Sequence, residues 1–444
     1  MVYPYDLDDI PRNSLARPTE TYRTHETKRD SRCHQVREEP PIMSHDHDGM
    51  IWRERAVNQV LERRAAVIET IDPETVSLDE VTGRVLAESI VAETDHPALD
   101  RATMDGYALD ATDDYPLTIT KSEVYPEDDV PQLDSGEAIE IATGAPLPPS
   151  ANAVLRREDA EVTDGQLFGP SIEPGTYTYE RGSNVEAGER LFDAGERLSP
   201  KDAIFLGDLG YETVEVRCTL SVGVLATGTE IHEGTSTDLD SPMLMGLVGS
   251  WGHEATYEGT VPDEYERVER AIADLAAQYD VVVTTGGTSV GHKDYVVRAL
   301  ESLGEITFHR VRLRPGKPIA LAALPDATVF AIPGKPLGAH TVSTLVMRPF
   351  FTGVERIPTL GATFTHDLGV GPEGFEYAVP VVLEEGAATP LGHVDSPLAV
   401  YDDEFDASVL SSSTRATRAD GFVLTETALD AGEQIEVVLY PTVE

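Results

Sequence analysis

The sequence predicts a multidomain fold that combines a doubly wound α/β domain with β-rich regions on both sides of it. The chain has 444 residues, which is more than a single hydrophobic core usually organises. Strand-like and helix-like segments alternate over residues 218–353, as they do in a mostly parallel sheet covered by helices. Short β segments with regularly spaced Pro and Gly precede and follow that region, which is typical of small all-β domains.

The first 49 residues are polar and show no hydrophobic period, so we predict a disordered tail over 1–49. Met43 and Met50 could both serve as start positions. The run HDHD at 45–48 contains metal-ligating residue types. In a tail of this composition, however, we interpret the run as solvated rather than as a metal site.

An N-terminal domain is expected over 50–217, with a β-rich insertion at about 95–185. Its second helix is predicted to run from Val76 to about Gly83. Its last helix should start at Ser199-Pro200, because Pro is favoured in the first helical turn. The first helix is predicted by apolar residues at helical spacing, namely Trp52, Ala56, Val60, Val67 and Ile68.

The α/β domain is expected over 218–353, around the stretch VVVTTGGTSVGHKDY at 281–295. Three consecutive valines fit a strand that is buried on both faces. Glycines at the end of such a strand let the backbone approach a ligand, and a strand, a Gly-rich loop and a helix start often bind phosphate. An ordinary tight turn would also explain two glycines. The residues of this predicted site are Gly286, Gly287, Thr288 and Ser289.

Two similar basic loops flank later strands of this domain: RPGKP at 314–318 and PGKP at 333–336. The chain has only six lysines, and Lys293, Lys317 and Lys335 all lie in loops of this one domain. Loops at the carboxyl ends of strands line the ligand crevice of an open α/β sheet. We therefore predict an anion-binding site there.

Three aspartates occupy loop positions: Asp105, Asp240 and Asp294. Taken singly, each could be a turn former or a helix cap. Asp294 could cap the helix from Tyr295, and Ser241 is the expected N-cap of a helix that continues through Pro242. Beside phosphate-binding loops, however, the three carboxylates predict a divalent cation, most simply Mg²⁺.

Composition limits the possible partners and surroundings. With 34 Lys and Arg against 79 Asp and Glu, the net charge is −45, which argues against nucleic acid as a partner. An acidic chain poor in Lys is typical of adaptation to a salty cytoplasm. Cys33 and Cys218 are isolated, so no disulfide framework is expected. Because no apolar run is long enough for a membrane span or a signal region, a cytoplasmic protein is expected.

The motifs of the chain, in their order, resemble those of the MoeA and gephyrin E-domain family, the molybdopterin molybdenumtransferases. The resemblance covers about 51–444. The matching motifs are SLDEV from Ser77, MDGYA from Met104, TGAPLP from Thr143, GGTSVG from Gly286 with Asp294-Tyr295, RPGKP from Arg314, and ADGF from Ala419. A single motif of this length would be weak evidence, whereas an ordered set is specific.

The resemblance implies an elongated N-terminal region with a β-rich insertion, a doubly wound α/β molybdopterin-binding domain and a C-terminal β-barrel over 354–444. It implies a homodimer with each site formed between subunits. The implied reaction converts adenylylated molybdopterin and molybdate, with Mg²⁺, into molybdenum cofactor and AMP. The implied residues for metal or nucleotide binding and hydrolysis are Asp105, Thr143, Asp240 and Asp294, and those for molybdate and phosphate are Arg310, Arg314 and Lys317.

The chain departs from the family pattern at several positions, namely Asn184, Pro242, His292 and Lys335. Two carboxylates are lost and two lysines gained, so tungstate is an alternative oxyanion. Molybdopterin adenylyltransferase is an alternative function, because that family shares the α/β domain; its loop usually reads GGTG. A non-catalytic molybdopterin-binding carrier is the other alternative. The sequence does not distinguish the salt optimum or the protein that receives the cofactor.

Overall fold

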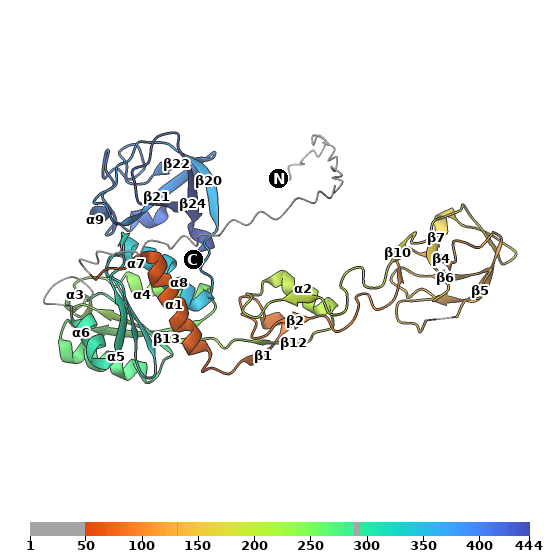
Figure 1. Ribbon diagram of the computed structural model, residues 1–444, viewed down its shortest axis with the longest axis horizontal. Helices are drawn as coiled ribbons and strands as arrows, with labels where there is room; N and C mark the ends of the chain where they lie inside the picture. Colours follow the sequence, from red (N-terminus) through yellow and green to blue (C-terminus); the bar gives the residue numbers. More distant parts are fainter. Residues whose placement is uncertain (1–48, 131, 288–293) are drawn as a thin grey trace, which may run out of the picture. The chain divides into compact units, whose positions relative to one another are not determined.

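The computed structural model describes residues 49–130, 132–287 and 294–444 (Figure 1). The predicted tail therefore lies outside the described residues except for Gly49, and so do Thr288, Ser289, His292 and Lys293. In the described part of the chain, no helix combines the length and the apolar character that crossing a membrane requires.

A six-stranded sheet organises the predicted α/β domain. The strand order is β14-β13-β15-β19-β18-β16. Strands β14, β13, β15 and β19 are parallel, while β18 is antiparallel to both of its neighbours. The strands are β13 (Ser221–Thr227), β14 (Glu254–Val261), β15 (Val281–Thr285), β16 (Glu305–His309), β18 (Ala320–Ala323) and β19 (Thr328–Ile332). The short connection from β18 to β19 explains the reversal, because a parallel crossover needs about a dozen residues.

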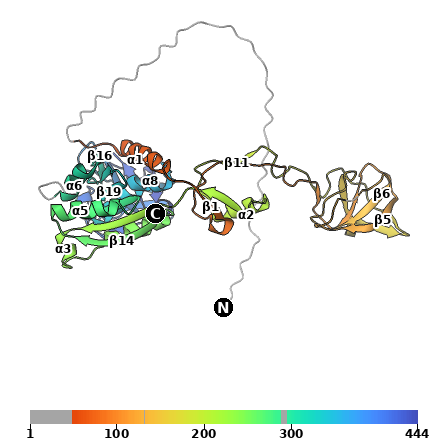
Figure 2. The same cartoon turned by 90° about the horizontal axis from the view of Figure 1, so that it is seen from below.

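Helices cover both faces of this sheet, which confirms the doubly wound fold (Figure 2). Helices α5 and α6 pack on one face, through side chains such as Ile272 and Leu300. Helices α4, α7 and α8 pack on the other face, through side chains such as Leu244 and Phe350. The helices are α3 (Thr229–His232), α4 (Asp240–Ser250), α5 (Tyr265–Ala276), α6 (Tyr295–Leu303), α7 (Pro336–Val342) and α8 (Arg348–Thr352), with a π-helical turn at Ser343–Met347 between the last two.

The valine run behaves as predicted. All five residues of β15 are buried, and adjacent valines point to opposite faces: Val281 and Val283 belong to one core cluster, whereas Val282 belongs to the other. A strand covered on both faces needs apolar side chains at every position rather than at alternate ones.

The N-terminal elements confirm the first predicted helix and correct the second. Helix α1 (Arg53–Ile68) buries Ala56, Val60 and Ile68, but Trp52 precedes the helix and is exposed. The helix predicted from Val76 is wrong. The segment forms strand β1 (Glu74–Ser77), which pairs with β12 (Thr213–Val216), followed by a single 3-10 turn at Leu78–Glu80. β-Branched residues at the start and a distant pairing partner override the local helical pattern.

The predicted helix at Ser199-Pro200 is present as α2 (Pro200–Asp208). Its N-cap is a reciprocal capping box between Ser199 and Asp202. Short antiparallel pairs join this region to the insertion: β2 (Ile90–Val91) with β11 (Arg190–Phe192), and β3 (Arg101–Ala102) with β10 (Thr178–Tyr179).

The insertion is β-rich, as predicted. Its six-stranded sheet has the order β7-β4-β6-β5-β9-β8. Buried aliphatic side chains such as Ile139, Ile141 and Val154 form its core. The strands are β4 (Gly106–Leu109), β5 (Leu117–Val124), β6 (Glu137–Ile141), β7 (Ala153–Arg156), β8 (Glu161–Thr163) and β9 (Gln166–Phe168).

The C-terminal region is a closed barrel, which confirms the remaining part of the fold class. Its strands follow the order β21-β22-β20-β24-β23, and a pairing between β21 and β23 closes the ring. Strand β17 (Leu313–Arg314) adds to β21, so the basic RPGKP loop starts on the barrel sheet. The barrel strands are β20 (Thr359–Phe364), β21 (Glu376–Glu384), β22 (Ala387–Pro390), β23 (Gly421–Thr425) and β24 (Gln434–Leu439), with the short helix α9 at Ala407–Leu410.

Candidate functional site

A cleft of about 550 Å³ lies at the carboxyl edge of the α/β sheet. The ends of three parallel strands contribute to it: Thr227-Gly228 after β13, Thr285 to Gly287 after β15, and Pro333 to Lys335 after β19. The RPGKP loop and residues of α9 complete the lining. The crevice therefore lies where an open α/β sheet is expected to bind its ligand.

Glycine is required at the floor of this cleft. Gly286 has φ +88°, and a Cβ there would lie 2.4 Å from the carbonyl oxygen of Thr227. Gly316 has φ +113°, and a Cβ would lie 2.3 Å from Val342 Cγ1. Both positions combine a left-handed backbone with contacts too short for any side chain. At the predicted Gly-rich loop, the end of β15 therefore closely approaches the end of β13. Thr288 and Ser289 of the predicted site lie outside the described residues.

In the described part of the chain, three basic side chains line the cleft: Arg314, Lys317 and Lys335. The Arg314 guanidinium lies 4.2 Å, and the Lys317 ammonium 5.9 Å, from the centre of the Phe375 ring. Cations over an aromatic face are stabilised without losing their charge. Among the described residues, no carboxylate lies within ion-pair distance of these three side chains, so their charges are available to an anion.

Asp240 lies directly behind the cleft wall. Its Oδ2 accepts a hydrogen bond from the Thr285 hydroxyl at 3.0 Å, and Thr285 lines the cleft. Its other oxygen, Oδ1, is buried and has no hydrogen-bond partner in the described part of the chain. Burial raises the pKa of the Asp240 carboxyl to about 6. A buried carboxylate with a free oxygen is a strong ligand for a hard cation.

The predicted N-cap of helix α4 is wrong. The helix starts at Asp240, and the backbone N–H of Ser241 donates to Asp238 Oδ1 at 3.0 Å. Asp238 therefore performs the capping that we assigned to Ser241. Asp238 Oδ2 is also buried without a partner among the described residues, so two carboxylates with free oxygens lie at the start of this helix.

Asp294 and Arg310 form a second group of predicted residues, and neither contributes to the described cleft lining. Asp294 caps α6, because its Oδ1 accepts the Val297 N–H at 3.4 Å. Burial raises the pKa of the Asp294 carboxyl. His309 Nε2 lies 3.9 Å from Asp294 Oδ2, and burial lowers the pKa of His309 to about 4. Arg310 adopts φ +73°.

Asp105 and Thr143 are brought together in the insertion sheet. Asp105 Oδ1 accepts both the backbone N–H and the hydroxyl of Thr143, each at 2.7 Å. These hydrogen bonds, the hydroxyl first, hold the pKa of the exposed Asp105 carboxyl below its usual value. No insertion residue belongs to the cleft lining as far as the chain is described. The pair is therefore preorganised and ionised, but not part of the same cavity.

Sequence reasoning missed three contributions to the cleft. Phe375 supplies the aromatic face beneath Arg314 and Lys317. Helix α9 of the barrel lines the cleft through Ala407 and Ser408. Glu230 and Asp263 form an acidic side. Only the acidic residues carried a signal, since they follow the carboxyl ends of β13 and β14; the barrel residues are distant in sequence and have no motif.

Two family descriptions match the chain. The MoeA N-terminal region (domain I and II) matches residues 54–210, and the probable molybdopterin binding domain matches residues 223–353. The second match contains the strand ends and the basic loops of the cleft.

Curated proteins and solved structures agree with these matches. A putative molybdopterin biosynthesis protein of Methanocaldococcus jannaschii is 29% identical over 382 residues, which are 82% of this chain and 90% of that protein. The molybdopterin molybdenumtransferase of Synechococcus elongatus is 31% identical over 302 residues, 62% of this chain and 74% of that protein. The crystal structure of the molybdopterin biosynthesis MoeA protein from Pyrococcus horikosii superimposes with a TM-score of 0.69 at 29% identity, covering 88% of this chain and 99% of that one. The ordered motifs, the fold and these matches together show that the chain belongs to the MoeA family.

Proposed function

We propose that this chain is a molybdopterin molybdenumtransferase, which inserts molybdate into adenylylated molybdopterin and releases AMP. One observation carries most of the proposal. In a chain with a net charge of −45, the cleft at the carboxyl edge of the sheet gathers Arg314, Lys317 and Lys335, none of which pairs with a described carboxylate. Curated relatives in the same family are named molybdopterin molybdenumtransferase, which supports the metal-insertion part of the proposal.

The basic side of the cleft suits the anionic parts of such a substrate. Arg314 presents a planar guanidinium, which matches a phosphate or oxyanion through two parallel hydrogen bonds, and Lys317 adds a point charge. Backbone at Gly286 and Gly316 can approach the ligand closely, because no side chain stands in the way. The acidic side, with Glu230 and Asp263, suits N–H and O–H donors such as those of a pterin and a ribose.

The donor set behind the cleft wall fits Mg²⁺. Asp240 and Asp238 each have a buried oxygen without a partner in the described residues, and Mg²⁺ prefers carboxylate oxygens and water. Asp240 would hold the ion, with Asp238 beside it. A bound Mg²⁺ would neutralise charge on the phosphates during hydrolysis of the phosphoanhydride. Asp294 fits this set less well, because its Oδ1 caps α6.

The homodimer is part of the proposal. Asp105 is ionised and held by Thr143, yet the cleft lining in the described residues contains no part of the insertion. A symmetric dimer in which the insertion of one subunit reaches the cleft of the other would give Asp105 a catalytic place and would contain two equivalent sites.

The test is AMP release from adenylylated molybdopterin, measured with molybdate, with tungstate and with neither oxyanion. Oxyanion-dependent release of AMP supports the proposal, and the faster oxyanion identifies the preferred metal. Formation of adenylylated molybdopterin from ATP and molybdopterin would instead indicate an adenylyltransferase. Tight pterin binding without AMP release under any salt concentration would indicate a carrier.

A further inference from the structure

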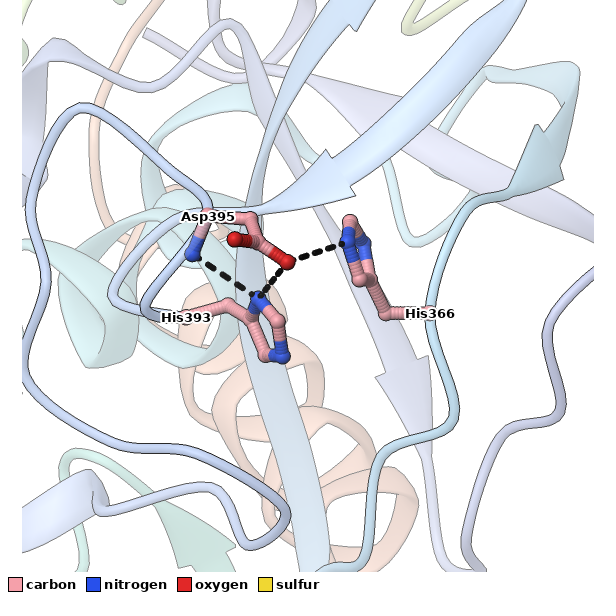
Figure 3. A group of neighbouring side chains, drawn as sticks. All are labelled: His366, His393 and Asp395. Carbon is pink, nitrogen blue, oxygen red and sulfur yellow. Dashed lines mark hydrogen bonds and ion pairs between the residues drawn. The ribbon is translucent and has the colours of Figure 1, made fainter.

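Among the described residues, three side chains of types that bind metals converge in the C-terminal barrel (Figure 3). His366 follows strand β20, while His393 and Asp395 belong to the segment after β22. One ligand atom from each residue lies within 4.8 Å of those of the other two. None of the three residues lines the cleft, so this cluster is independent of the proposed reaction.

The hydrogen bonds of His393 leave its Nδ1 without a hydrogen. Nδ1 accepts the backbone N–H of Asp395 at 3.2 Å, and the Asp395 carboxylate oxygen Oδ2 lies 3.8 Å from the same nitrogen. A ring nitrogen that accepts a hydrogen bond holds a lone pair and not a proton in the neutral ring. The Asp395 carboxylate lies beside this nitrogen, and an ion bound there would take over the lone pair that now accepts the long hydrogen bond from the Asp395 N–H.

His366 adds a third donor to the same point. Its Nδ1 lies 2.7 Å from the Thr365 hydroxyl, whose single hydrogen also has the Ala388 carbonyl oxygen as an acceptor at 3.2 Å. When that hydrogen bonds to the carbonyl, His366 Nδ1–H donates to the hydroxyl. The lone pair of His366 Nε2 then faces Asp395 Oδ2 at 3.4 Å.

The two imidazole rings lie close enough together to share one ion with the carboxylate. Their centres are 4.2 Å apart, and their planes are tilted by 38° relative to each other. A single divalent ion between the three donors would satisfy both rings and the carboxylate at once.

We propose that His366, His393 and Asp395 bind a divalent transition-metal ion of the Zn²⁺ class. Two imidazole nitrogens and one carboxylate favour Zn²⁺ and its neighbours over Mg²⁺ and Ca²⁺, which prefer oxygen alone. Ligand atoms bound to Zn²⁺ at about 2.1 Å in tetrahedral geometry are roughly 3.4 Å apart, and His366 Nε2 and Asp395 Oδ2 already lie 3.4 Å apart.

The burial of the ligands suits a site that is held by the fold and filled from solvent. The His393 side chain is only 9% exposed and anchors the site, whereas Asp395 is 70% exposed and can rotate to close the remaining distance. Three protein ligands leave one position for water. The ion would tie the end of β20 to the segment after β22 and so stabilise the barrel.

Binding should be measured on the full chain, purified without a polyhistidine tag, freed of metal by a chelator, and kept in high salt with excess Mg²⁺. Mg²⁺ and salt suppress loose binding to surface carboxylates. Zn²⁺ titration by calorimetry should give one tight site per chain. Co²⁺ should give the visible absorption bands of a four-coordinate site, and Zn²⁺ should raise the melting temperature.

Two variants remove a ligand, a third restores one, and a fourth is the matched control. His366→Gln and Asp395→Asn each remove a direct ligand. Loss of a residue that only hydrogen-bonds to a metal ligand weakens binding by roughly 10- to 100-fold, so each variant should weaken Zn²⁺ binding by more than that. Asp395→His should retain the Co²⁺ bands, because it restores a ligand. Asp402→Asn removes the same charge from a nearby exposed position and should leave the affinity unchanged.

Four outcomes would overturn the proposal. The first two are that His366→Gln binds Zn²⁺ as tightly as the wild-type chain and that Asp402→Asn loses binding. The third is that millimolar Mg²⁺ competes with Zn²⁺. The fourth is that binding is lost when His45 and His47 of the tail are both replaced by Gln. Each readout is independent of AMP release, so failure of this proposal and failure of the proposed function are distinguishable.

Discussion

The two ends of helix α4 carry buried titratable side chains with opposite arrangements. At its start, Asp240 has one oxygen bonded to Thr285 and the other without a partner in the described residues. Just after its end, His253 is bonded at both ring nitrogens: Nδ1 accepts the Leu220 N–H at 2.9 Å, and Nε2 donates to the Phe351 carbonyl oxygen at 3.0 Å. Burial disfavours the charged form of both groups, raising the pKa of Asp240 to about 6 and lowering that of His253 to about 4.

The difference separates a functional group from a structural one. A buried group whose hydrogen bonds are all made stabilises the fold, whereas a buried group with a free atom destabilises it until a ligand binds. His253 joins β13 to helix α8 and is complete without a ligand. Asp240 lies behind the cleft with an unused oxygen, so its unfavourable burial is explained if Mg²⁺ or a substrate completes it.

Replacing Asp240 by Asn should give the largest effect on activity and an opposite effect on stability. The loss of a metal-holding carboxylate should lower kcat by at least about 100-fold, because the ion supplies several kcal/mol of charge stabilisation. Without metal, the same substitution should stabilise the folded state by up to about 3 kcal/mol at pH 7, since ionising a carboxyl whose pKa is raised from 3.8 to about 6 opposes folding.

The pH dependence gives the sign of this stability effect. The folded state binds the Asp240 proton more tightly than the unfolded state does, so the contribution of wild-type Asp240 to stability falls as pH rises from about 4 to 6. Asp240→Asn should remove that fall, and urea unfolding in EDTA measures it. Asp274→Asn, at an exposed position on α5, is the control. A variant that loses activity and stability together would make Asp240 a structural residue like His253.

Lys317 differs from Asp240 because it lines the cleft itself and forms no ion pair with a described carboxylate. We expect Lys317→Ala to affect binding of the anionic substrates. Loss of a charge-assisted hydrogen bond should weaken the affinity for molybdate and the pterin phosphate by about 10- to 150-fold. At about 1 M salt the Debye length is only about 3 Å, so the distant negative charges should not mask the effect. Lys201→Ala, at an exposed position on α2, is the control and should bind molybdate and the pterin phosphate normally. Unchanged affinity of Lys317→Ala for both would show that Lys317 is not part of the site.

Asp105 differs from Asp240 in that its carboxylate is exposed, ionised and hydrogen-bonded to Thr143. Asp105→Asn and Lys317→Ala homodimers should each lose most activity. Mixed dimers of the two variants should recover up to about half of the wild-type rate, because one of the two sites then draws intact residues from different subunits. The heterodimers are obtained by co-expression with two tags. No recovery in a verified heterodimer would mean that both residues serve a site within one chain, or that Asp105 is only a turn former.

The fold was largely predictable because its main signals are local. The valine run of β15, the alternation of elements over 218–353 and the Ser199-Pro200 start of α2 each depend on neighbouring residues. The errors occurred where distant segments decide. Val76 pairs with Val214, more than a hundred residues away, and forms a strand instead of the predicted helix.

The candidate site was predictable in part for the same reason. Two consecutive glycines follow the valine run and lysine is rare in this chain, so the strand-end loops and Lys317 could be found from the sequence. Phe375 beneath Arg314 and Lys317, and helix α9 in the cleft lining, could not, since both come from the barrel and are distant in sequence from the strand-end loops. The direction in which a carboxyl pKa shifts could not be predicted from the sequence either. Asp105 and Asp240 are the same residue type, but hydrogen bonds lower the pKa of Asp105 and burial raises that of Asp240.

The smallest predicted effect concerns His253 at the other end of α4. Because the folded state lowers the pKa of His253 from 6.5 to about 4, the unfolded chain binds a proton first as pH falls. The stability that His253 contributes is therefore complete above about pH 6.5 and declines towards pH 4, by about 2 kcal/mol between pH 7 and pH 5. This pH trend is opposite in sign to that of Asp240.

His253→Gln should be less stable than the wild-type chain at pH 7, because it loses the packing of the ring against Phe351, and its deficit should shrink by about 2 kcal/mol at pH 5. Urea unfolding followed by tryptophan fluorescence measures this, since Trp251 is buried against the same phenylalanine. AMP release at pH 7 should remain near the wild-type rate, because both ring nitrogens bond to backbone rather than to the cleft. If His253→Gln lost the same free energy of unfolding at pH 7 and at pH 5, the neutral ring of His253 would not be the form that bonds β13 to α8. A large loss of AMP release in a folded variant would mean that both ends of α4 serve the site.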